Sequence, residues 1–542
     1  MNSYRYQSAV SFQALLGFAL LAPAAQIVAQ TSGAERPNVL FIMSDDHTSQ
    51  AIGVYGSRLA GLNPTPVIDR IGREGIVFNN AFCTNAISTP SRACIISGQY
   101  SQTNGVLDLS GELVAEKQNL PREMKALGYE TAVVGKWHLG ILPEAFDYYQ
   151  VLYDQGEYFD PVLVSPEDTT YAVGKWGKRR GRQFKGHSSD VLTDCTLDWL
   201  ENRRDKSKPF FLCHHFKAPH DLFEFHPRYK DYLEDTFIPE PGSLWYDGNH
   251  GSEATYGKDR SLADTIGSSV GKRNRVRNMG RHMDIDPSLP DDEYKRAAYQ
   301  EYLKRYLRCV KGVDDNVKRI FDYLEKEGLM DNTIIVYTGD QGFFLGEHDY
   351  IDKRWMYEEA MRMPLLMRYP PKIKAGTRTD AIVNNVDFAP TLIELCGGKK
   401  PAYMQGDSFA WITDGSNEPK GWKQHTYYRY WMHMAHGHNN PAHFGIRTHD
   451  YKLIFFYGTD YRDRKVKPRN ARAFQFNKML TPAGWELYDL RKDPQELNNV
   501  YGRPEYARVT EELKALLKQE RERLNETDLN YPKIQAIIEA NR

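Results

Sequence analysis

Acidic and amide side chains closely follow two apolar segments that lie far apart in the chain. The two pairs are Asp45–Asp46, after residues 38–43 (NVLFIM), and Asp340–Gln341, after residues 333–337 (TIIVY). Adjacent carboxylates repel each other unless a cation lies between them. One aspartate pair alone is more often a turn or a helix cap, but the repeated arrangement offers three carboxylates and one amide oxygen. These hard oxygen ligands favour one Ca²⁺ ion, or less strongly Mg²⁺.

A serine stands just before a predicted helix. Ser88 begins the sequence STPSR (residues 88–92), and an apolar helical stretch at residues 93–96 follows. A helix N-terminus favours negative charge, so an adduct on this serine would be stabilised there. Arg92 could hold that adduct by charge-assisted hydrogen bonds. The alternative is a capping serine with proline at an early helix position, which the segment taken alone slightly favours.

Basic and imidazole side chains also follow apolar segments. They are Lys136 and His138 after residues 131–134 (TAVV), His220 after residues 209–213 (PFFLC), and Lys353 within residues 350–355 (YIDKRW). Taken singly, such a lysine is more often a solvated surface residue, and such a histidine a hydrogen-bonded core residue. Their position after predicted strands makes them candidates for acid–base chemistry and for binding an anion.

The elements that must position these residues are predicted from hydrophobic patterning. Four apolar segments without alternation predict strands buried on both faces: residues 38–43, 131–134, 209–213 and 333–337. Helical periodicity separates them, at residues 190–202 and 293–326. This alternation predicts an α/β fold with a large, mostly parallel sheet flanked by helices. Because ligands in such folds bind beyond the carboxyl ends of the strands, all the polar clusters should meet at one rim.

The pattern changes after residue 415. Short antiparallel strands are predicted at residues 444–447, 451–456 and 486–490, followed by an amphipathic helix at residues 506–524. We therefore expect a catalytic domain over residues 36–415 and a smaller C-terminal α+β subdomain, built on an antiparallel sheet, over residues 416–542.

Composition and the N-terminus narrow the functional classes. The chain has 542 residues, 70 Lys+Arg and 71 Asp+Glu, so no binding of nucleic acid is expected. The apolar residues 15–25 and the small residue Ala29 predict a signal peptide over residues 1–29, and therefore export to the periplasm or secretion. Pro23 and the short apolar run argue against a stable membrane anchor. The six cysteines could pair after export, but buried free thiols are at least as consistent with the sequence.

Four motifs in this order resemble the sulfatase family. They are the opening strand with Asp45 and Asp46 (residues 36–46), the Ser-x-Pro-x-Arg signature (88–92), GKWHLG (135–140) and GDQG (339–342). The resemblance spans about residues 36–410 and continues into the C-terminal sheet. It implies an alkaline-phosphatase-like fold and the hydrolysis of a sulfate ester.

The resemblance also implies a modified nucleophile. Ser88 would be oxidised to formylglycine (3-oxoalanine), an aldehyde that is hydrated to a geminal diol. One hydroxyl attacks sulfur and releases the alcohol; the second, once deprotonated, expels sulfate and restores the aldehyde. Because the position is serine and not cysteine, the implied partner is a serine-type radical sulfatase-maturating enzyme.

Roles for the other residues follow from the same resemblance. The implied Ca²⁺ ligands are Asp45, Asp46, the modified Ser88, Asp340 and Gln341, where the family often has asparagine in place of the glutamine. The implied catalytic group is Ser88, Arg92, Lys136, His138, His220 and Lys353. Lys136 and Lys353 would bind sulfate, His138 would remove the proton of the second hydroxyl, and His220 could protonate the leaving oxygen.

The substrate is predicted less directly. Residues 427–438 (YYRYWMHMAHGH) are dense in aromatic rings and histidines. The predicted sugar-contacting residues are His433, His436, His443 and Arg447. A core-facing strand with a surface loop explains this segment equally well. The overall resemblance is to exo-acting 6-O-sulfatases of N-acetylhexosamines, which implies a sulfated carbohydrate as substrate.

Two alternatives remain open. The first is a phosphate or phosphonate monoester hydrolase of the same superfamily, with unmodified Ser88 as phosphoryl acceptor; the sequence offers no second set of metal ligands for a two-metal phosphatase. The second is an inactive protein that binds sulfated glycans. The joint presence of Ser88, Lys136, His138, His220 and Lys353 argues against it.

Overall fold

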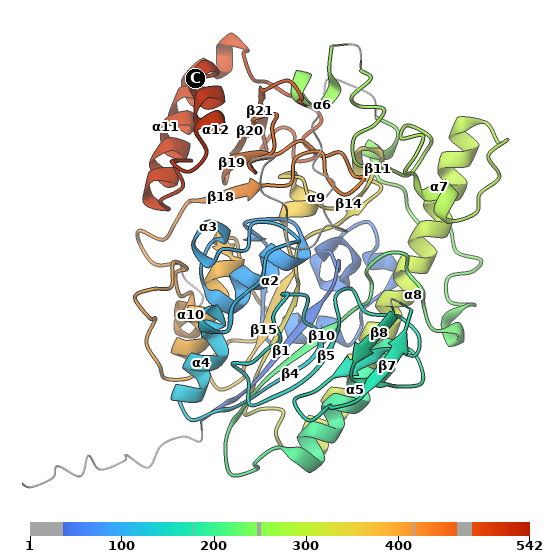
Figure 1. The fold of residues 1–542 in the computed structure, drawn as a ribbon, viewed down its shortest axis with the longest axis vertical. Coiled ribbons are helices and arrows are strands. Elements are labelled where there is room, and N and C mark those ends of the chain that lie inside the picture. Colours follow the sequence, from blue (N-terminus) through green and yellow to red (C-terminus); the bar gives the residue numbers. More distant parts are fainter. Residues whose placement is uncertain (1–35, 176, 247–250, 259, 416–417, 463–479) are drawn as a thin grey trace, which may run out of the picture. The chain divides into compact units, whose positions relative to one another are not determined.

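A ten-stranded sheet runs through the middle of the unit formed by residues 37–542 (Figure 1). Its strands, in spatial order, are β16 (Thr377–Thr379), β2 (Ile76–Phe78), β15 (Leu365–Arg368), β12 (Thr333–Gly339), β1 (Asn38–Ser44), β10 (Phe210–Phe216), β4 (Glu130–Lys136), β5 (Tyr148–Leu152), β6 (Val162–Val164) and β9 (Arg182–Gln183). The computed structural model describes residues 36–175, 177–246, 251–258, 260–415, 418–462 and 480–542. The predicted signal peptide lies outside these residues.

The five central strands are parallel. Strand β1 pairs with β12 and β10, β10 pairs with β4, and β4 pairs with β5, all in the same direction. Ser44 at the end of β1 lies opposite Gly339 of β12 and Phe216 of β10. The carboxyl ends of these strands therefore meet at one edge. Antiparallel pairing is confined to the outer strands, so the predicted mostly parallel sheet is confirmed.

Each face of the sheet is covered by helices. The odd-numbered side chains of β1, such as Phe41, share a core with α2 (Ser88–Ser97), α4 (Asn119–Ala126) and α10 (Phe388–Leu395). The even-numbered ones, such as Ile42, share a core with α1 (Ile68–Arg73), α5 (Ser188–Asp198) and α8 (Asp291–Lys326). Figure 1 shows these helices on the two sides of the sheet. Because both faces of β1 are buried, its sequence is continuously apolar.

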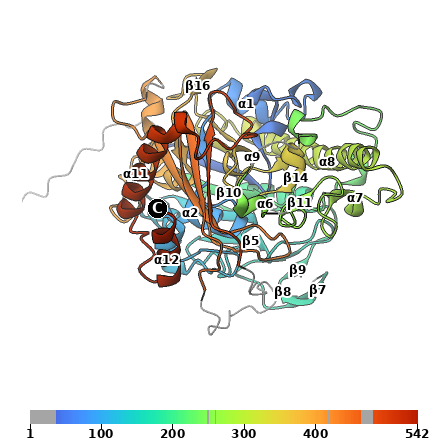
Figure 2. The same ribbon diagram turned by 90° about the horizontal axis from the view of Figure 1, so that it is seen from above.

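The C-terminal part forms a second, antiparallel sheet. Its strands are β18 (His425–Tyr430), β19 (His443–Thr448), β20 (Tyr451–Phe456) and β21 (Gly484–Asp489). Helices α11 (Ala507–Arg523) and α12 (Pro532–Ala540) lie on one side of it, and α11 contacts β19 (Figure 2). The predicted antiparallel sheet is thus confirmed. The predicted boundary at residues 415 and 416 stays a prediction, because residues 416–417 lie outside the described part.

The chain also contains short elements outside these two sheets. The small strands are β3 (Ala81–Phe82), β7 (Tyr171–Gly174), β8 (Gly177–Arg180), β11 (Ser268–Ser269), β13 (Phe344–Leu345), β14 (Tyr350–Asp352) and β17 (Val383–Asn384), and the one-turn helices are α3 (Ser101–Asn104), α6 (Glu253–Tyr256), α7 (Met279–His282) and α9 (Glu358–Met361). All six cysteines are buried free thiols. Across the described ranges, no helix combines the length and apolar composition that crossing a bilayer requires.

Candidate active site

The predicted polar clusters meet at the carboxyl edge of the parallel strands. Asp45 and Asp46 follow β1, Asp340 and Gln341 follow β12, and Lys136 is the last residue of β4. All five side chains are completely buried. Ser88 opens helix α2 and is 2% exposed, whereas His220 is 9% exposed and so lies closest to solvent in this group. These residues are far apart in the sequence, and they come together because their strands are neighbours in the sheet.

The acidic residues contact one another closely. The backbone N–H of Asp46 donates to Asp340 Oδ1 (3.1 Å), and Gln341 Nε2 donates to Asp46 Oδ1 (2.5 Å). Asp46 has a φ of 63°, a left-handed conformation that ends the strand and is uncommon outside glycine, asparagine and aspartate. Burial raises the pKa of Asp46 to about 6, against the attraction of Lys353, and burial with repulsion from Asp45 raises the pKa of Asp340. Carboxylates buried this close therefore favour either protonation or a nearby cation.

The donor set fits a divalent hard cation. Asp45, Asp46 and His220 each offer one ligand atom, and these atoms lie within 4.8 Å of one another. Gln341 Oε1 is buried and has no hydrogen-bond partner among the described residues, so it is an acceptor suited to a metal ligand. Carboxylate and amide oxygens are the ligands that Ca²⁺ and Mg²⁺ prefer. His220 was not predicted to be part of this group, and nitrogen is the less usual donor for these ions.

Ser88 and Arg92 face the acids from the first turns of α2. The Ser88 hydroxyl donates to Asp45 Oδ1 (3.2 Å). Arg92 is 1% exposed, and its Nε donates to Asp340 Oδ2 (3.1 Å) while Nη1 donates to the Lys136 carbonyl oxygen (2.7 Å). Its Nη2 also lies 3.7 Å from Asp45 Oδ1, so the guanidinium contacts residues at the ends of β12, β4 and β1 beside the serine.

Two lysines supply positive charge to the same acids. Lys136 Nζ contacts Asp45 Oδ2 and Gln155 Oε1. Lys353 Nζ lies 2.7 Å from Asp46 Oδ2. Burial alone would raise the pKa of Asp45, but Lys136, His220, Arg92 and Lys353 hold it well below its usual value. The site thus combines an ionised carboxylate with cations that can face an anionic ligand.

The two histidines have different partners. His138 Nε2 lies 3.0 Å from Asp154 Oδ1, while its Nδ1 is buried without a hydrogen-bond partner in the described part of the chain. Burial lowers the pKa of His138 to about 4, although Asp154 raises it, so the ring is neutral at pH 7 and able to accept a proton. His220 Nδ1 lies 2.6 Å from Asp221 Oδ1, and its Nε2 lies 3.8 Å from Asp46 Oδ2.

Sequence reasoning missed the residues that hold this group in place. They are Asp154, Gln155, Lys217 and Asp221. Lys217 Nζ donates to the Gln155 carbonyl oxygen (3.0 Å), and burial together with Lys136 lowers its pKa to about 8. Lys217 directly follows β10, so its strand-end position is a signal that could have identified it. Asp154 and Gln155 follow β5, a strand that the apolar pattern did not reveal.

The predicted sugar-contacting residues do not stay together. His433 and His443 are completely buried, and His443 stacks on Tyr428 at 5.6 Å between ring centroids. Arg447 is 6% exposed, and its Nε donates to Glu358 Oε1 (3.1 Å). His443 and Arg447 belong to β19, His433 lies between β18 and β19, and all three side chains are buried, so their predicted contact with a sugar stays a prediction. His436 is exposed, and its Nδ1 lies 3.2 Å from Arg354 Nη2, next to Lys353 in sequence.

Two family models match the chain. The sulfatase model matches residues 37–398, which is more than half of the sequence. The model described as N-sulphoglucosamine sulphohydrolase, C-terminal, matches residues 346–473 and 462–523.

Individual proteins are similar along nearly the whole chain. An N-acetylglucosamine-6-O-sulfatase of Bacteroides thetaiotaomicron is 38% identical over 551 aligned residues, covering 95% of this chain and 91% of that protein. A solved structure of a protein with its substrate D-glucosamine-2-N,6-O-disulfate has a TM-score of 0.76 at 36% identity, covering 91% of this chain and 99% of that one. A phosphonate monoester hydrolase of Agrobacterium radiobacter has a TM-score of 0.66 at 20% identity, covering 92% and 97%; this likeness concerns the fold alone.

Proposed function

The chain belongs to the sulfatase family and hydrolyses sulfate esters of glycans, and from this premise we propose that its substrate is a terminal 6-O-sulfated N-acetylglucosamine. The observation that carries the proposal is the similarity over 95% of the chain to a protein named for that activity. The proposal includes an exo mode of action, in which the terminal sugar enters the site.

The proposal includes Ca²⁺ and formylglycine at position 88. Asp45, Asp46, Asp340 and Gln341 would hold the ion together with the modified Ser88, and the unpartnered Gln341 Oε1 supports this ligand set. When bound, the ion neutralises the acidic group and polarises a sulfate oxygen. The hydrated aldehyde supplies two hydroxyls on one carbon. Conversion of Ser88 would require a serine-type radical maturase.

The surrounding residues have distinct roles in this proposal. Lys136 and Lys353 present positive charge to the sulfate, where a fixed cation stabilises negative charge that develops during transfer. His138 accepts a proton from the group at position 88. His220, oriented by Asp221 at 2.6 Å, donates a proton to the leaving sugar oxygen. Arg92 orients residue 88 and Asp340 by the bonds described above.

Sugar contacts are proposed for the residues beside Lys353. Arg354 and His436 lie within 3.2 Å of each other, and Arg354 Nε lies 3.1 Å from Asp352 Oδ2. Such convergent donors and acceptors suit sugar hydroxyls. In this proposal, His433, His443 and Arg447 do not contact the sugar; they pack beneath the segment that carries His436. Export by the predicted signal peptide, to the periplasm or beyond, would bring the enzyme to extracellular glycans.

The test is sulfate release from a panel of sulfated sugars. The protein is co-expressed with a serine-type maturase and offered N-acetylglucosamine-6-sulfate, sugars sulfated at other positions, and phosphate and phosphonate monoesters. Release from the 6-sulfate alone, lost on addition of a Ca²⁺ chelator and restored by Ca²⁺, is expected. Turnover confined to a phosphate or phosphonate ester would contradict the proposal. So would a Ser88 peptide of unmodified mass in protein that is fully active.

A further inference from the structure

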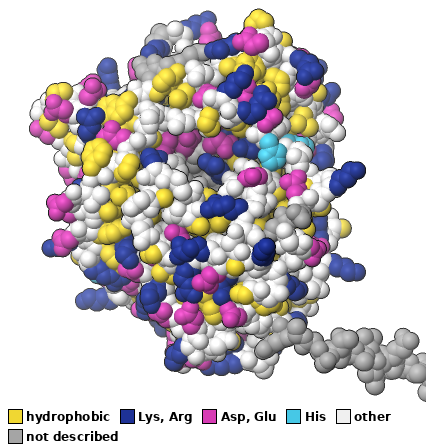
Figure 3. All heavy atoms as spheres, turned by 180° about the vertical axis from the view of Figure 1, so that it is seen from behind, with side chains coloured by type: hydrophobic (Ala, Val, Ile, Leu, Met, Phe, Trp, Pro, Cys, Tyr) yellow, Lys and Arg dark blue, Asp and Glu magenta, His cyan; other side chains and the backbone are white. Residues whose placement is uncertain are grey.

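Strands β7 and β8 pair as a two-stranded hairpin that leads directly into β9 (Arg182–Gln183). The described residues of this stretch, 171–175 and 177–185, are called the β7–β8 hairpin below and carry an unusual concentration of positive charge. Residues 171–185 include six basic residues, and residues 169–189 include no Asp or Glu before Asp190: the basic residues are Lys175, Lys178, Arg179, Arg180, Arg182 and Lys185. The chain as a whole is nearly neutral, with 70 Lys+Arg and 71 Asp+Glu. The face shown in Figure 3, for example, carries both signs side by side. The hairpin is therefore a local departure from a nearly neutral protein.

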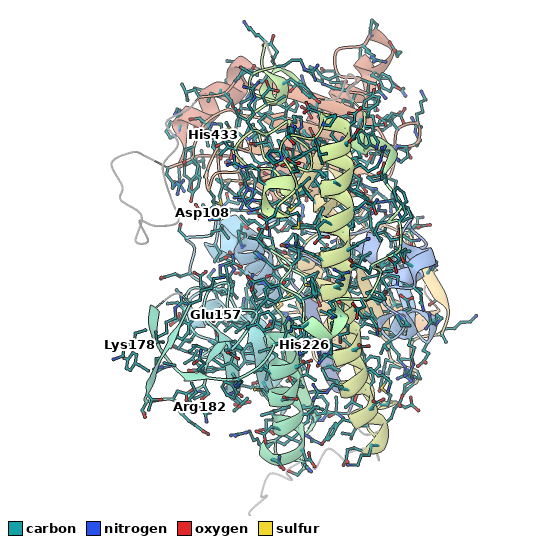
Figure 4. The ribbon with its side chains drawn as sticks, turned by 90° about the vertical axis from the view of Figure 1, so that its right-hand side faces the viewer. Asp108, Glu157, Lys178, Arg182, His226 and His433 are labelled. Atoms are coloured by element: carbon teal, nitrogen blue, oxygen red, sulfur yellow. The ribbon has the colours of Figure 1, made fainter. Side chains whose placement is uncertain are left out.

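Most of this charge is available to solvent. Lys178 and Lys185 are exposed and have no ion-pair partner among the described residues, and Arg182 is 53% exposed although it pairs with Asp168 (2.9 Å). Figure 4 labels Lys178 on β8 and Arg182 on the adjoining strand β9. Tyr171 is 63% exposed, and Lys178 Nζ lies 5.4 Å above its ring. An exposed ring flanked by cations offers a surface for a sugar that bears anionic groups.

The hairpin borders the active site through two loops. Arg179 lies over the ring of Tyr153 at 5.5 Å, and Tyr153 directly precedes the Asp154 and Gln155 that contact His138 and Lys136. Lys175 Nζ lies 3.6 Å from Glu224, which follows His220 by four residues. Arg179 Nη1 is buried and makes no hydrogen bond within the described part of the chain. The basic stretch therefore lies next to the two loops that border the proposed sulfate pocket, and the exposed acids of those loops are Asp154 and Glu224.

We propose that the β7–β8 hairpin binds the further sulfated and carboxylated sugars of a longer glycan whose terminal sugar occupies the active site. The proposal rests on the proposed function, because it assumes that the enzyme cleaves sulfate from a chain end. A basic surface beside the reacting centre raises the local concentration of a polyanion and speeds its capture. Arginine also matches the planar oxygens of sulfate-like anions with paired N–H groups.

The experiment compares one sugar with a chain. The triple variant Lys178→Ser, Arg182→Ser, Lys185→Ser is assayed on N-acetylglucosamine-6-sulfate and on a sulfated hexasaccharide that ends in this sugar. The ratio of kcat/KM for the hexasaccharide to that for the monosaccharide should fall roughly three- to tenfold in the variant, since three exposed charges are lost. The matched control, Lys326→Ser, Arg508→Ser, Lys518→Ser, removes three exposed charges elsewhere and should keep the ratio.

Two further measurements separate failure of the hairpin from failure of the proposed function. The wild-type preference for the hexasaccharide should weaken with added NaCl, and weaken less in the hairpin variant. Binding of the hexasaccharide to Ser88→Ala, with and without the hairpin substitutions, reports on the surface without any turnover. An equal effect on both substrates, an unchanged ratio, or unchanged hexasaccharide binding overturns the hairpin proposal. Absence of sulfate release with hairpin-dependent binding intact would instead count against the proposed function.

Discussion

The rim of the large sheet and the interior of the C-terminal sheet both bury several charges, but they arrange them differently. In the C-terminal sheet, Glu358 lies 3.1 Å from Arg447 and 3.0 Å from Lys452, and Lys452 lies 2.6 Å from Glu496. Burial would raise the pKa of Glu358, yet Arg447 and Lys452 hold it below its ordinary value. Lys452 thus lies between two glutamates, and burial raises the pKa of Glu496 to about 7.

At the rim, acids are placed beside acids. The backbone N–H of Asp46 donates to Asp340 Oδ1 (3.1 Å), and burial raises the pKa of both carboxyls although Lys353 and Arg92 lie beside them. Such an arrangement costs stability unless a ligand completes it. Both regions therefore pair buried acids with cations. The rim differs in that its charges stand beside Ser88 and the unpartnered Gln341 Oε1, where a ligand can bind.

The largest expected effect is on turnover at the rim. Ser88→Ala, in protein prepared with the maturase, should lower kcat by about 10³-fold or more, because the reacting group is removed. Its urea midpoint should stay close to the wild type, since the hydroxyl makes one hydrogen bond at 3.2 Å. Sulfate release and unfolding are measured on the same preparation. Retained sulfate release would contradict the nucleophile assignment.

In the C-terminal sheet we expect the reverse: a large effect on stability and a small effect on turnover. Arg447→Ala leaves Glu358 with a weakened set of partners and should lower the free energy of unfolding by about 3 kcal/mol. The kcat of the folded enzyme should change by no more than about twofold. Denaturant unfolding and steady-state kinetics check the two halves. A large fall in kcat at unchanged stability would instead indicate that Arg447 contacts the substrate.

The smallest expected effect is a shift in pH dependence. Asp154→Asn removes the carboxylate that raises the pKa of His138, so the acidic limb of kcat/KM should move to lower pH. The shift should be only a few tenths of a pH unit, because Asp154 is 64% exposed and solvent screens its charge. Asp205→Asn, at a distant exposed site, is the control. A shift to higher pH would be incompatible with His138 as the base.

Sequence reasoning identified the rim because its residues occupy strand ends. Once residues 38–43 and 333–337 are read as parallel strands, Asp45 and Asp340 must lie at the same edge. The residues that contact His138 and Lys136 were missed for a related reason. Asp154 and Gln155 follow β5 (YYQVL), whose polar Gln150 interrupts the apolar run that marks the other strands.

The C-terminal histidines could not be assigned in this way. Residue type alone suggested a sugar pocket, but His443 sits on a strand that is buried on both faces, between the aromatic rings of Tyr428 and Trp355. A high density of aromatic and imidazole side chains occurs both in protein cores and in sugar-binding pockets, so residue type alone does not distinguish them. Only the packing of β18 against β19 distinguishes the two, and one sequence does not contain that information.

The pairing of β1 with β12 affects the order of synthesis, folding and any modification of Ser88. Asn38 pairs with Thr333, so the rim cannot close until most of the chain has been synthesised. Ser88 is 2% exposed once Asp340 and Arg92 are in place. An enzyme that acts on this serine must therefore reach it on the nascent or unfolded chain. Slow closure of the sheet would prolong that interval, and rapid folding would leave part of the population without the modification proposed for Ser88.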